Sequence, residues 1–307
     1  MKKKVTFKNG IWNLAGILYL PDSFDEKKQY PALVFGNPGG SVKEQTPADY
    51  GEGLSKKGII VLTFDASHQG ESEGEPQLYD NPYERSEDIK CGVDFLTTLS
   101  YVDRNCIGAI GQCAGSGFAI FAALTDRRIK AVCGLCCTNP GATTRQGWDG
   151  KRTVEENIRV LDEIAAQRTA EANGASAKYV HYVPEQEEIN EKTYPDMVVG
   201  NQYYRNEAKH PNSPNLFRFT GLANRMTFDA YEFIPQYLDR PLLVINGSKA
   251  GSLWQSIKAY ELSNGPKELW VVENAGHFDF YHNPACIEKT VDKIAEFFDE
   301  TLVSTNN

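Results

Sequence analysis

The sequence has 307 residues, of which 41% are hydrophobic and 24% charged. This length is enough for one large α/β domain with an insertion or for two ordinary domains. Its net charge of −9 argues against nucleic acid as a partner, because phosphate binding needs clustered lysine and arginine. No apolar run approaches the roughly 18 residues of a membrane-spanning helix, and the start MKKKVTFKNG leads into no signal-peptide core. We therefore expect a cytoplasmic protein that contacts no membrane.

The seven cysteines are an odd number in a chain without a secretion signal, which is typical of reduced thiols. Cys133 and Cys136 form a C-x-x-C pair, but no second pair follows it. The surrounding IKAVCGLCC has the apolar character of a buried strand, where free cysteine is a common core residue. We expect neither a metal site nor a cofactor.

The predicted elements alternate between strands and helices. The first twenty residues alternate loosely between apolar and polar, which predicts an antiparallel hairpin. Continuous apolar runs predict buried strands at residues 31–36, 58–65, 106–111, 129–137, 241–247 and 267–273. Helices are predicted over residues 83–100, 114–125 and 287–302. This order predicts a mostly parallel central sheet of about eight strands with helices on both faces and ligands at the carboxyl ends of the strands.

About a hundred residues separate the fourth of these apolar runs from the fifth. They hold a charged helical stretch, TVEENIRVLDEIAAQRTAEANG, and then a tyrosine-rich region. Structureless segments of that length are rare inside compact domains. We therefore predict that residues 139–235 fold as a cap, inserted into a core made of residues 1–138 and 236–307. Such a cap would line a substrate pocket and exclude water. The alternative is an insert that forms a homodimer interface.

The stretch IGQCAGSG, at residues 110–117, comes directly after the third predicted parallel strand. Gly111, Cys113 and Gly115 match the nucleophile-elbow frame G-x-S-x-G, with cysteine in place of serine. In that frame a sharp strand-to-helix turn exposes the central side chain. An acyl-transfer site also needs a base and donors for the developing oxyanion.

The order of an elbow-type site along the chain identifies the other candidates. The base is expected near the C-terminus, and His277 lies in NAGHFDF directly after the last predicted strand. The oxyanion donors are expected to be the amide after the nucleophile and an amide after the first parallel strand. The first is Ala114. In NPGG the second is Gly39, because Pro38 has no N–H group.

Five segments together resemble a known family. PGGSVKEQT, FDASHQGESEGEP, the GxCxG elbow, GSKAGSLWQS and NAGHFDFY resemble the cysteine-bearing branch of the dienelactone-hydrolase-like α/β hydrolases. The similarity is to the YcjY-type bacterial hydrolases and the fungal polyketide transferase and thiohydrolase family. It covers residues from about 10 to 300, with the cap matching least. It implies an α/β-hydrolase fold with a helical cap, Cys113 as nucleophile, His277 as base, and action on esters, lactones or acyl thioesters.

The acid of a catalytic triad is missing at its usual place. Many relatives carry aspartate where this chain has Gly251, and the whole stretch PLLVINGSKAGSLWQSIKAY contains no carboxylate. A thiol is acidic enough to form an ion pair with His277 unaided. Otherwise another carboxylate serves, with Asp229 in MTFDAYEF as the best candidate and Glu273 and Asp279 as others. A third possibility is that catalysis has been lost and the fold kept.

The expected reaction is nucleophilic attack by the Cys113 thiolate on a small-molecule acyl substrate, followed by hydrolysis of the thioester. Trp254, Tyr203 and Tyr204 are candidates for lining a partly aromatic substrate pocket. Glu44, in SVKEQT, either contacts the resting thiol or caps the following helix.

Three alternatives remain open at this point. The first is an acyltransferase that passes the acyl group to an alcohol or an amine. The second is a non-catalytic protein that binds acyl ligands on the same fold, which Gly251 motivates. The third is a redox sensor built on an acidic Cys113, since activated thiols are easily oxidised.

Overall fold

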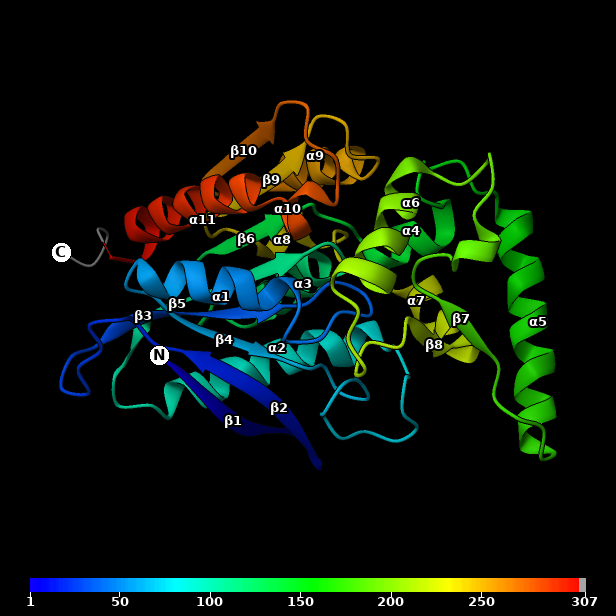
Figure 1. Ribbon diagram of the computed structural model, residues 1–307, viewed down its shortest axis with the longest axis horizontal. Coiled ribbons are helices and arrows are strands. Elements are labelled where there is room, and N and C mark those ends of the chain that lie inside the picture. Colours follow the sequence, from blue (N-terminus) through cyan, green and yellow to red (C-terminus); the bar gives the residue numbers. More distant parts are fainter. Residues whose placement is uncertain (304–307) are drawn as a thin grey trace.

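Eight strands form the central sheet of the computed structural model, which describes residues 1–303. They are β1 (Lys2–Asn9), β2 (Trp12–Tyr19), β3 (Tyr30–Gly36), β4 (Ile60–Phe64), β5 (Val102–Gln112), β6 (Val132–Leu135), β9 (Leu242–Gly247) and β10 (Lys267–Val272). Their order across the sheet is β1–β2–β4–β3–β5–β6–β9–β10 (Figure 1). β2 is antiparallel to β1 and β4, and every other neighbouring pair is parallel. The predicted mostly parallel sheet and the hairpin before it are confirmed.

The strands in the middle of the sheet are buried on both faces, which explains their continuous apolar sequences. In β3, Ala32 and Val34 belong to one hydrophobic core, and Leu33 and Phe35 belong to the other. All four are fully buried, because successive side chains of a strand point to opposite faces.

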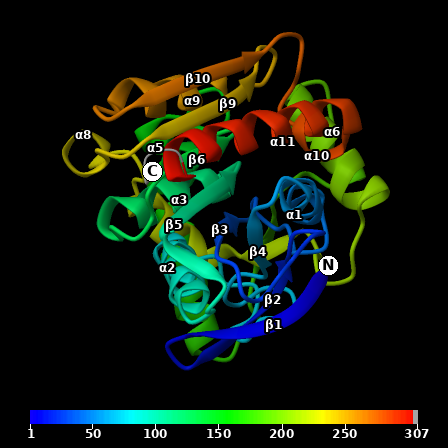
Figure 2. The same cartoon turned by 90° about the vertical axis from the view of Figure 1, so that its left-hand side faces the viewer.

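Helices cover both faces of the sheet (Figure 2). The core on one face receives side chains from α1 (Thr46–Lys56), α10 (Asp279–His282) and α11 (Pro284–Phe298). The core on the other face receives them from α2 (Pro82–Thr97), α3 (Ala114–Thr125), α8 (Ile234–Tyr237) and α9 (Leu253–Leu262). A π-helical turn, η4 (Asp299–Val303), follows α11. The sequence predicted α2, α3 and α11 but neither α1 nor α9.

The segment between β6 and α8 folds beyond one end of the sheet, on the right of Figure 1. Its elements are α4 (Pro140–Gln146), α5 (Val154–Ala172), β7 (Tyr179–His181), η1 (Gln186–Glu188), α6 (Pro195–Gln202), η2 (Tyr203–Glu207), β8 (Leu216–Arg218), η3 (Phe219–Gly221) and α7 (Leu222–Thr227). β7 and β8 form a separate antiparallel pair. We call this segment the cap. Among residues 1–303, no helix has both the length and the apolar character that crossing a membrane requires.

Candidate active site

Cys113 lies on a strained turn between β5 and α3. Its backbone angles, φ 52° and ψ −121°, fall in a region that non-glycine residues rarely occupy. Holding a residue there costs of the order of 1–3 kcal/mol, which the surrounding structure must supply. The Cys113 N–H donates to the carbonyl of Leu135 at 2.8 Å, and the Cys113 carbonyl accepts from the N–H of Ser116 at 3.0 Å. The turn is therefore held from both sides, as in a nucleophile elbow.

The two glycines of the elbow are required by close backbone packing. A Cβ atom on Gly115 would lie 2.0 Å from the carbonyl oxygen of Gly36, at the end of β3. A Cβ atom on Gly111 would lie 2.1 Å from the carbonyl oxygen of Gly115. The first turn of α3 thus packs directly against two strand ends, and the G-x-C-x-G spacing follows from this contact.

His277 is fully buried and is held by a hydroxyl group rather than by a carboxylate. Its Nδ1 lies 2.8 Å from the Oγ of Ser252, which also accepts a hydrogen bond from the Nδ2 of Asn246 at 3.2 Å. Ser252 lies in the turn between β9 and α9 and is itself fully buried. When Nδ1 donates its proton to Ser252, Nε2 is left free to accept one.

The thiol of Cys113 lies beside this histidine. Burial opposes its ionisation, but the charge of His277 and hydrogen bonds with His277, Tyr281 and Thr138 outweigh it, so the pKa of Cys113 is lowered from its usual value. The Tyr281 hydroxyl lies 3.4 Å from the Nε2 of His277, and the Thr138 Oγ1 lies 3.9 Å from the sulfur. This arrangement favours a thiolate, which is the reactive form of cysteine.

Two backbone N–H groups beside the thiol are free. Ala114 is the first residue of α3, and Gly39 follows the end of β3. Both line the same cavity as Cys113, and within residues 1–303 neither N–H donates to a protein acceptor. The ring of Tyr182, from the cap, lies over this loop, since a Cβ atom on Gly40 would come within 2.6 Å of it. The structure therefore brings both expected oxyanion donors to the thiol.

Lys43 anchors the loop that carries Gly39. Its Nζ is 2.8 Å from the Oδ2 of Asp65 and 2.8 Å from the Oε1 of Glu44, and its N–H donates to Asp65 at 2.8 Å. The Lys43 side chain is almost entirely buried. Glu44 thus forms an ion pair with its neighbour, and it does not line the cavity that contains Cys113.

The structure does not bring Asp229 to His277. The Asp229 carboxylate accepts hydrogen bonds from the Nδ2 of Asn139 at 2.6 Å and from the Nη2 of Arg145 at 2.7 Å, and so fixes the chain where it leaves the cap. Glu273 is exposed at the surface. Asp279 accepts from the N–H of Gly276 at 2.7 Å. None of the three carboxylates contacts the imidazole of His277.

A carboxylate that the sequence analysis did not single out, Asp196, lies behind the turns that carry Gly251 and His277. It comes from α6 of the cap, and its Oδ2 accepts from the N–H of Gly251 at 2.7 Å and from the Nε1 of Trp148 at 2.9 Å. Its Oδ1 accepts from the backbone N–H of His277 at 3.4 Å. A Cβ atom on Gly251 would lie 2.5 Å from the Trp148 Nε1 and 2.9 Å from the Asp196 Oδ2. The cap therefore fills the space that an acidic side chain at 251 would need.

A cavity of about 320 Å³ lies between the strand ends and the cap. Its walls are mostly apolar and aromatic, and they include Cys113, His277 and Tyr204. Tyr203 and Trp254 are not part of them. The Tyr203 hydroxyl accepts from the N–H of Thr46 at 2.9 Å, and the Trp254 Nε1 donates to the carbonyl of Trp148 at 3.1 Å. Of the three aromatic residues expected to bind substrate, the structure brings only Tyr204 to the cavity.

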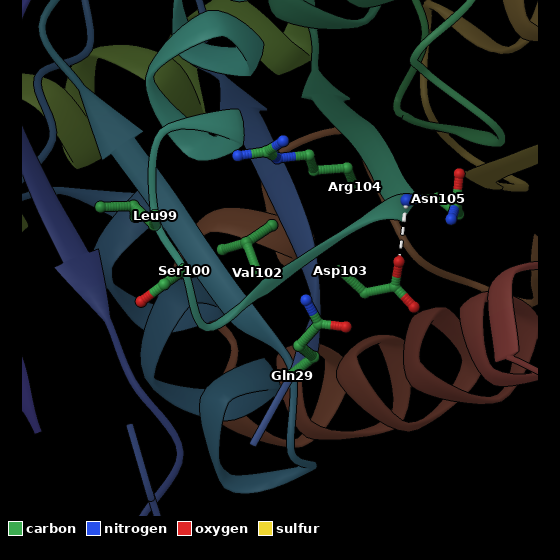
Figure 3. Close-up of a pocket in the computed structure, with 7 residues that line it drawn as sticks. All are labelled: Gln29, Leu99, Ser100, Val102, Asp103, Arg104 and Asn105. Carbon is green, nitrogen blue, oxygen red and sulfur yellow. Dashed lines mark hydrogen bonds between the residues drawn. The ribbon is translucent and has the colours of Figure 1, made fainter. Parts of the chain in front are cut away.

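Another pocket, of about 210 Å³, lies at the start of β5 (Figure 3). Its polar groups are used locally, since Asp103 accepts from the N–H of Asn105 at 2.9 Å and the Arg104 Nε donates to the carbonyl of Thr97. It contains neither a cysteine nor a histidine. Within residues 1–303, no group of three or more His, Cys, Asp or Glu side chains is arranged to hold a metal ion. We take the cavity at Cys113 as the candidate site, because it brings a cysteine and a buried histidine together.

Comparison with known proteins finds relatives that match nearly the whole chain. No model of a protein family matches the chain. The chain is 37% identical to the protein YcjY of Escherichia coli, over 98% of this chain and 100% of YcjY. It is 35% identical to the protein PA2218 of Pseudomonas aeruginosa, over 98% of this chain and 81% of that protein. The solved structure of PA2218 superposes with a TM-score of 0.92, covering 98% of this chain and 94% of the other.

Fungal proteins are more distant relatives. The acyltransferase drtE of Aspergillus calidoustus is 25% identical, over 90% of this chain and 88% of drtE. The solved structure of the α/β hydrolase GrgF from Penicillium is 17% identical and superposes with a TM-score of 0.82, covering 98% of this chain and 99% of that one. This structural similarity confirms the predicted α/β-hydrolase fold.

Proposed function

The chain belongs to the α/β-hydrolase family that contains YcjY and PA2218, and we propose that it cleaves ester, lactone or acyl-thioester bonds through a covalent thioester on Cys113. The observation that carries this proposal is the elbow itself. A cysteine is held at φ 52°, beside a buried histidine and two free backbone N–H groups. A cysteine with a merely structural role would need neither the backbone strain nor the free donors.

In the first half of the reaction, the Nε2 of His277 takes the proton of the Cys113 thiol, and the sulfur forms a bond to the acyl carbon. The carbonyl oxygen becomes an oxyanion, which accepts hydrogen bonds from the N–H groups of Ala114 and Gly39. When the intermediate collapses, the bond to the leaving group breaks and His277 returns the proton to that group. In the second half, water loses a proton to His277 as its oxygen bonds to the acyl carbon. The carbon–sulfur bond then breaks, the acid leaves, and His277 returns the proton to the Cys113 sulfur.

The nucleophile restricts the substrate class. A thiolate is a good leaving group, so the tetrahedral intermediate reverts to starting material unless the substrate's own leaving group departs as easily. Thioesters, lactones and activated esters meet this condition better than amides do, because an amine must first be protonated. The apolar and aromatic cavity favours an acyl group with substantial apolar surface.

An acyltransferase is the second candidate, because the related drtE is an acyltransferase that matches nearly the whole chain. Hydrolysis and transfer differ only in whether water or another nucleophile reaches the thioester. Product analysis in the presence of rising concentrations of an alcohol or an amine separates them. Formation of the new ester or amide supports transfer, whereas free acid alone at high acceptor concentration supports hydrolysis.

Turnover of a butyryl thioester by cysteine variants tests the proposed function. We expect Cys113→Ala to lose at least about a thousandfold in kcat/KM, because it removes the nucleophile. Cys286→Ala is the matched control, since Cys286 is also a free, partly exposed cysteine but lies in α11. Its kcat/KM should stay within about twofold. Substantial turnover by Cys113→Ala would refute the covalent route.

A further inference from the structure

The cavity that contains Cys113 has one permanently charged side chain in its wall, Arg225. Arg225 lies in α7 of the cap, and only 12% of its side chain is exposed. Apart from the proposed catalytic pair, the other residues of the wall are apolar, aromatic or neutral polar. A guanidinium in so apolar a cavity is energetically costly unless other groups neutralise its charge.

Protein groups neutralise this guanidinium only in part. Asp80 accepts from the Nη1 of Arg225 at 3.1 Å and also from the Nη1 of Arg85 at 3.2 Å. The side chains of Asp80 and Arg85 are each 3% exposed. One buried carboxylate is therefore shared by two arginines, and neither forms another ion pair within residues 1–303. The buried carboxylate of Asp88 also interacts electrostatically with Arg85, whereas Asp80 is the carboxylate paired with Arg225.

Arg225 has fewer protein partners than Arg85 does. Arg85 uses its further donors on protein acceptors, since its Nη2 donates to the carbonyl of Asn37 at 3.1 Å and its Nη1 reaches the Oε1 of Gln69 at 3.3 Å. In contrast, the Nε of Arg225 is buried without a partner. Its Nη2 has no acceptor within residues 1–303 either. Arg225 thus shares its carboxylate with Arg85 and retains unused donors.

Two aromatic rings in contact lie between Arg225 and the loop that carries Gly39 and Gly40. The guanidinium packs on the ring of Phe217, with 5.4 Å between its carbon and the ring centroid. The Phe217 ring lies 4.5 Å from that of Tyr182, which covers Gly39 and Gly40. An acyl carbonyl bound at the Gly39 N–H group would therefore have Arg225 farther along the same cavity wall.

We propose that Arg225 binds an anionic group, a carboxylate or a phosphate, on the substrate that acylates Cys113; this rests on the proposed function. The planar guanidinium fork matches both groups. A substrate that lacks the anion would leave the unused donors of Arg225 unpaired, so the site discriminates against it. Because the whole protein carries a net charge of −9, a local cation also offsets the general repulsion of an anionic substrate.

Two pairs of substrates test this proposal and separate the two sources of negative charge. The first pair is 4-nitrophenyl hemiglutarate and 4-nitrophenyl valerate, which differ in the carboxylate at the end of the acyl chain. The second is the butyryl thioester of 4′-phosphopantetheine and that of pantetheine, which differ in the phosphate of the leaving group. We expect the wild type to prefer the charged member of one pair by at least about tenfold in kcat/KM. Arg225→Met should reduce this preference by at least about tenfold, and the affected pair identifies the source.

Arg159→Met is the matched control, because Arg159 lies exposed on α5 of the cap, and it should keep the wild-type preference. Arg225→Lys, which keeps the charge but loses the fork, should retain part of the preference and serves if the methionine variant does not fold. Wild-type rates that are equal within both pairs, or a preference that survives in Arg225→Met or is complete in Arg225→Lys, would overturn the proposal.

Failure of this proposal is distinguishable from failure of the proposed function. If the valerate ester acylates Cys113 but no charged substrate is preferred, only the role of Arg225 is refuted. If no substrate acylates Cys113, binding of monomethyl glutarate and methyl valerate to Cys113→Ala is measured by calorimetry. Tighter binding of the glutarate that depends on Arg225 supports the anion site without catalysis, and equal binding refutes it.

Discussion

The Oγ of Ser252 lies 2.8 Å from the Nδ1 of His277, so a neutral hydroxyl occupies the place that a carboxylate takes in a serine-type triad. Because a thiol ionises far more readily than a serine hydroxyl, the base needs less help from an orienting anion. The hydroxyl can still fix the ring orientation and the tautomer, since Asn246 holds its Oγ from the other side. This relationship explains how the chain can keep an elbow and a base without an acid at Gly251.

Removing the Ser252 hydroxyl tests this role. We expect Ser252→Ala to lower kcat/KM by roughly tenfold to a hundredfold, which is less than the effect of losing a triad carboxylate in a serine enzyme. Ser263→Ala is the control, because Ser263 is equally buried and its Oγ has no hydrogen-bond partner in the described part of the chain. Steady-state kinetics with a thioester provide the measurement. Equal rates for the two variants would show that Ser252 does not orient the base.

Asp196 should act as a positioning residue that couples the cap to the catalytic turns. We expect Asp196→Asn to lower kcat by roughly ten- to a hundredfold, because an amide cannot accept from all the N–H groups that the carboxylate binds. Trp148 gives a readout beyond activity, since its Nε1 donates to Asp196 and its ring lies 5.0 Å from that of His277. Its fluorescence should change in the variant. Unchanged kcat and unchanged fluorescence would contradict the coupling.

The pKa of Cys113, lowered by His277, predicts the pH dependence of alkylation. A lowered pKa means that the thiolate persists to more acidic pH than in free cysteine, so iodoacetamide should label Cys113 rapidly at pH 7. Cys286 is an internal control, since burial raises its pKa to about 11 and it should react slowly. In His277→Gln the rate at Cys113 should fall at least about tenfold at pH 7 and recover at higher pH. A rate at Cys113 that does not depend on His277 would argue against the ion pair.

Gly115 should be intolerant of any side chain. Gly115→Ala places a Cβ atom 2.0 Å from the carbonyl oxygen of Gly36, which is rigid backbone at the end of β3. We expect a loss of about 2–4 kcal/mol in the free energy of unfolding, measured by urea denaturation. Gly221→Ala is the control, because the nearest atom to its Cβ would lie at an ordinary 3.5 Å. Equal stability of the two variants would show that the elbow can relax.

The sequence predicted those elements whose burial imposes a simple pattern. The parallel strands are buried on both faces, so their sequences are continuously apolar. In contrast, α9 buries Gln255, Ser256 and Ala259, and this partly polar set gives no apolar periodicity that would predict a helix. In α1 the large buried apolar residues are Tyr50 and Leu54, which are too few to define a helical face.

The positions of the candidate site residues were predictable where they follow from local chain geometry. Cys113, Ala114 and Gly39 occupy positions that the elbow fixes relative to strand ends, and His277 follows the last strand. Asp196 meets Gly251 only because the cap folds back onto the turn after β9, and Ser252 meets His277 because β9 and β10 are neighbours in the sheet. No local sequence pattern encodes either contact. Gly251 was the feature of the sequence that could have indicated the contact with Asp196, because a residue without a side chain leaves space that another part of the chain can fill.

Two neighbouring residues in the cap also have different surroundings that the sequence did not predict. Tyr203 and Tyr204 are adjacent in η2, but Tyr204 lines the cavity whereas the Tyr203 hydroxyl bonds to Thr46. Their separation depends on how η2 packs, and η2 is a π-helical turn that sequence periodicity does not predict. Composition alone therefore identified an aromatic region but not which of its rings line the cavity.

Intact-mass spectrometry after brief exposure to 4-nitrophenyl butyrate tests the covalent thioester most directly, with Cys113→Ala as the control. A single butyryl adduct on the wild type, absent from the control and decaying with time, is the predicted result. A folded wild-type protein that forms no adduct, and whose Cys113 also resists alkylation, would contradict nucleophilic catalysis at the elbow.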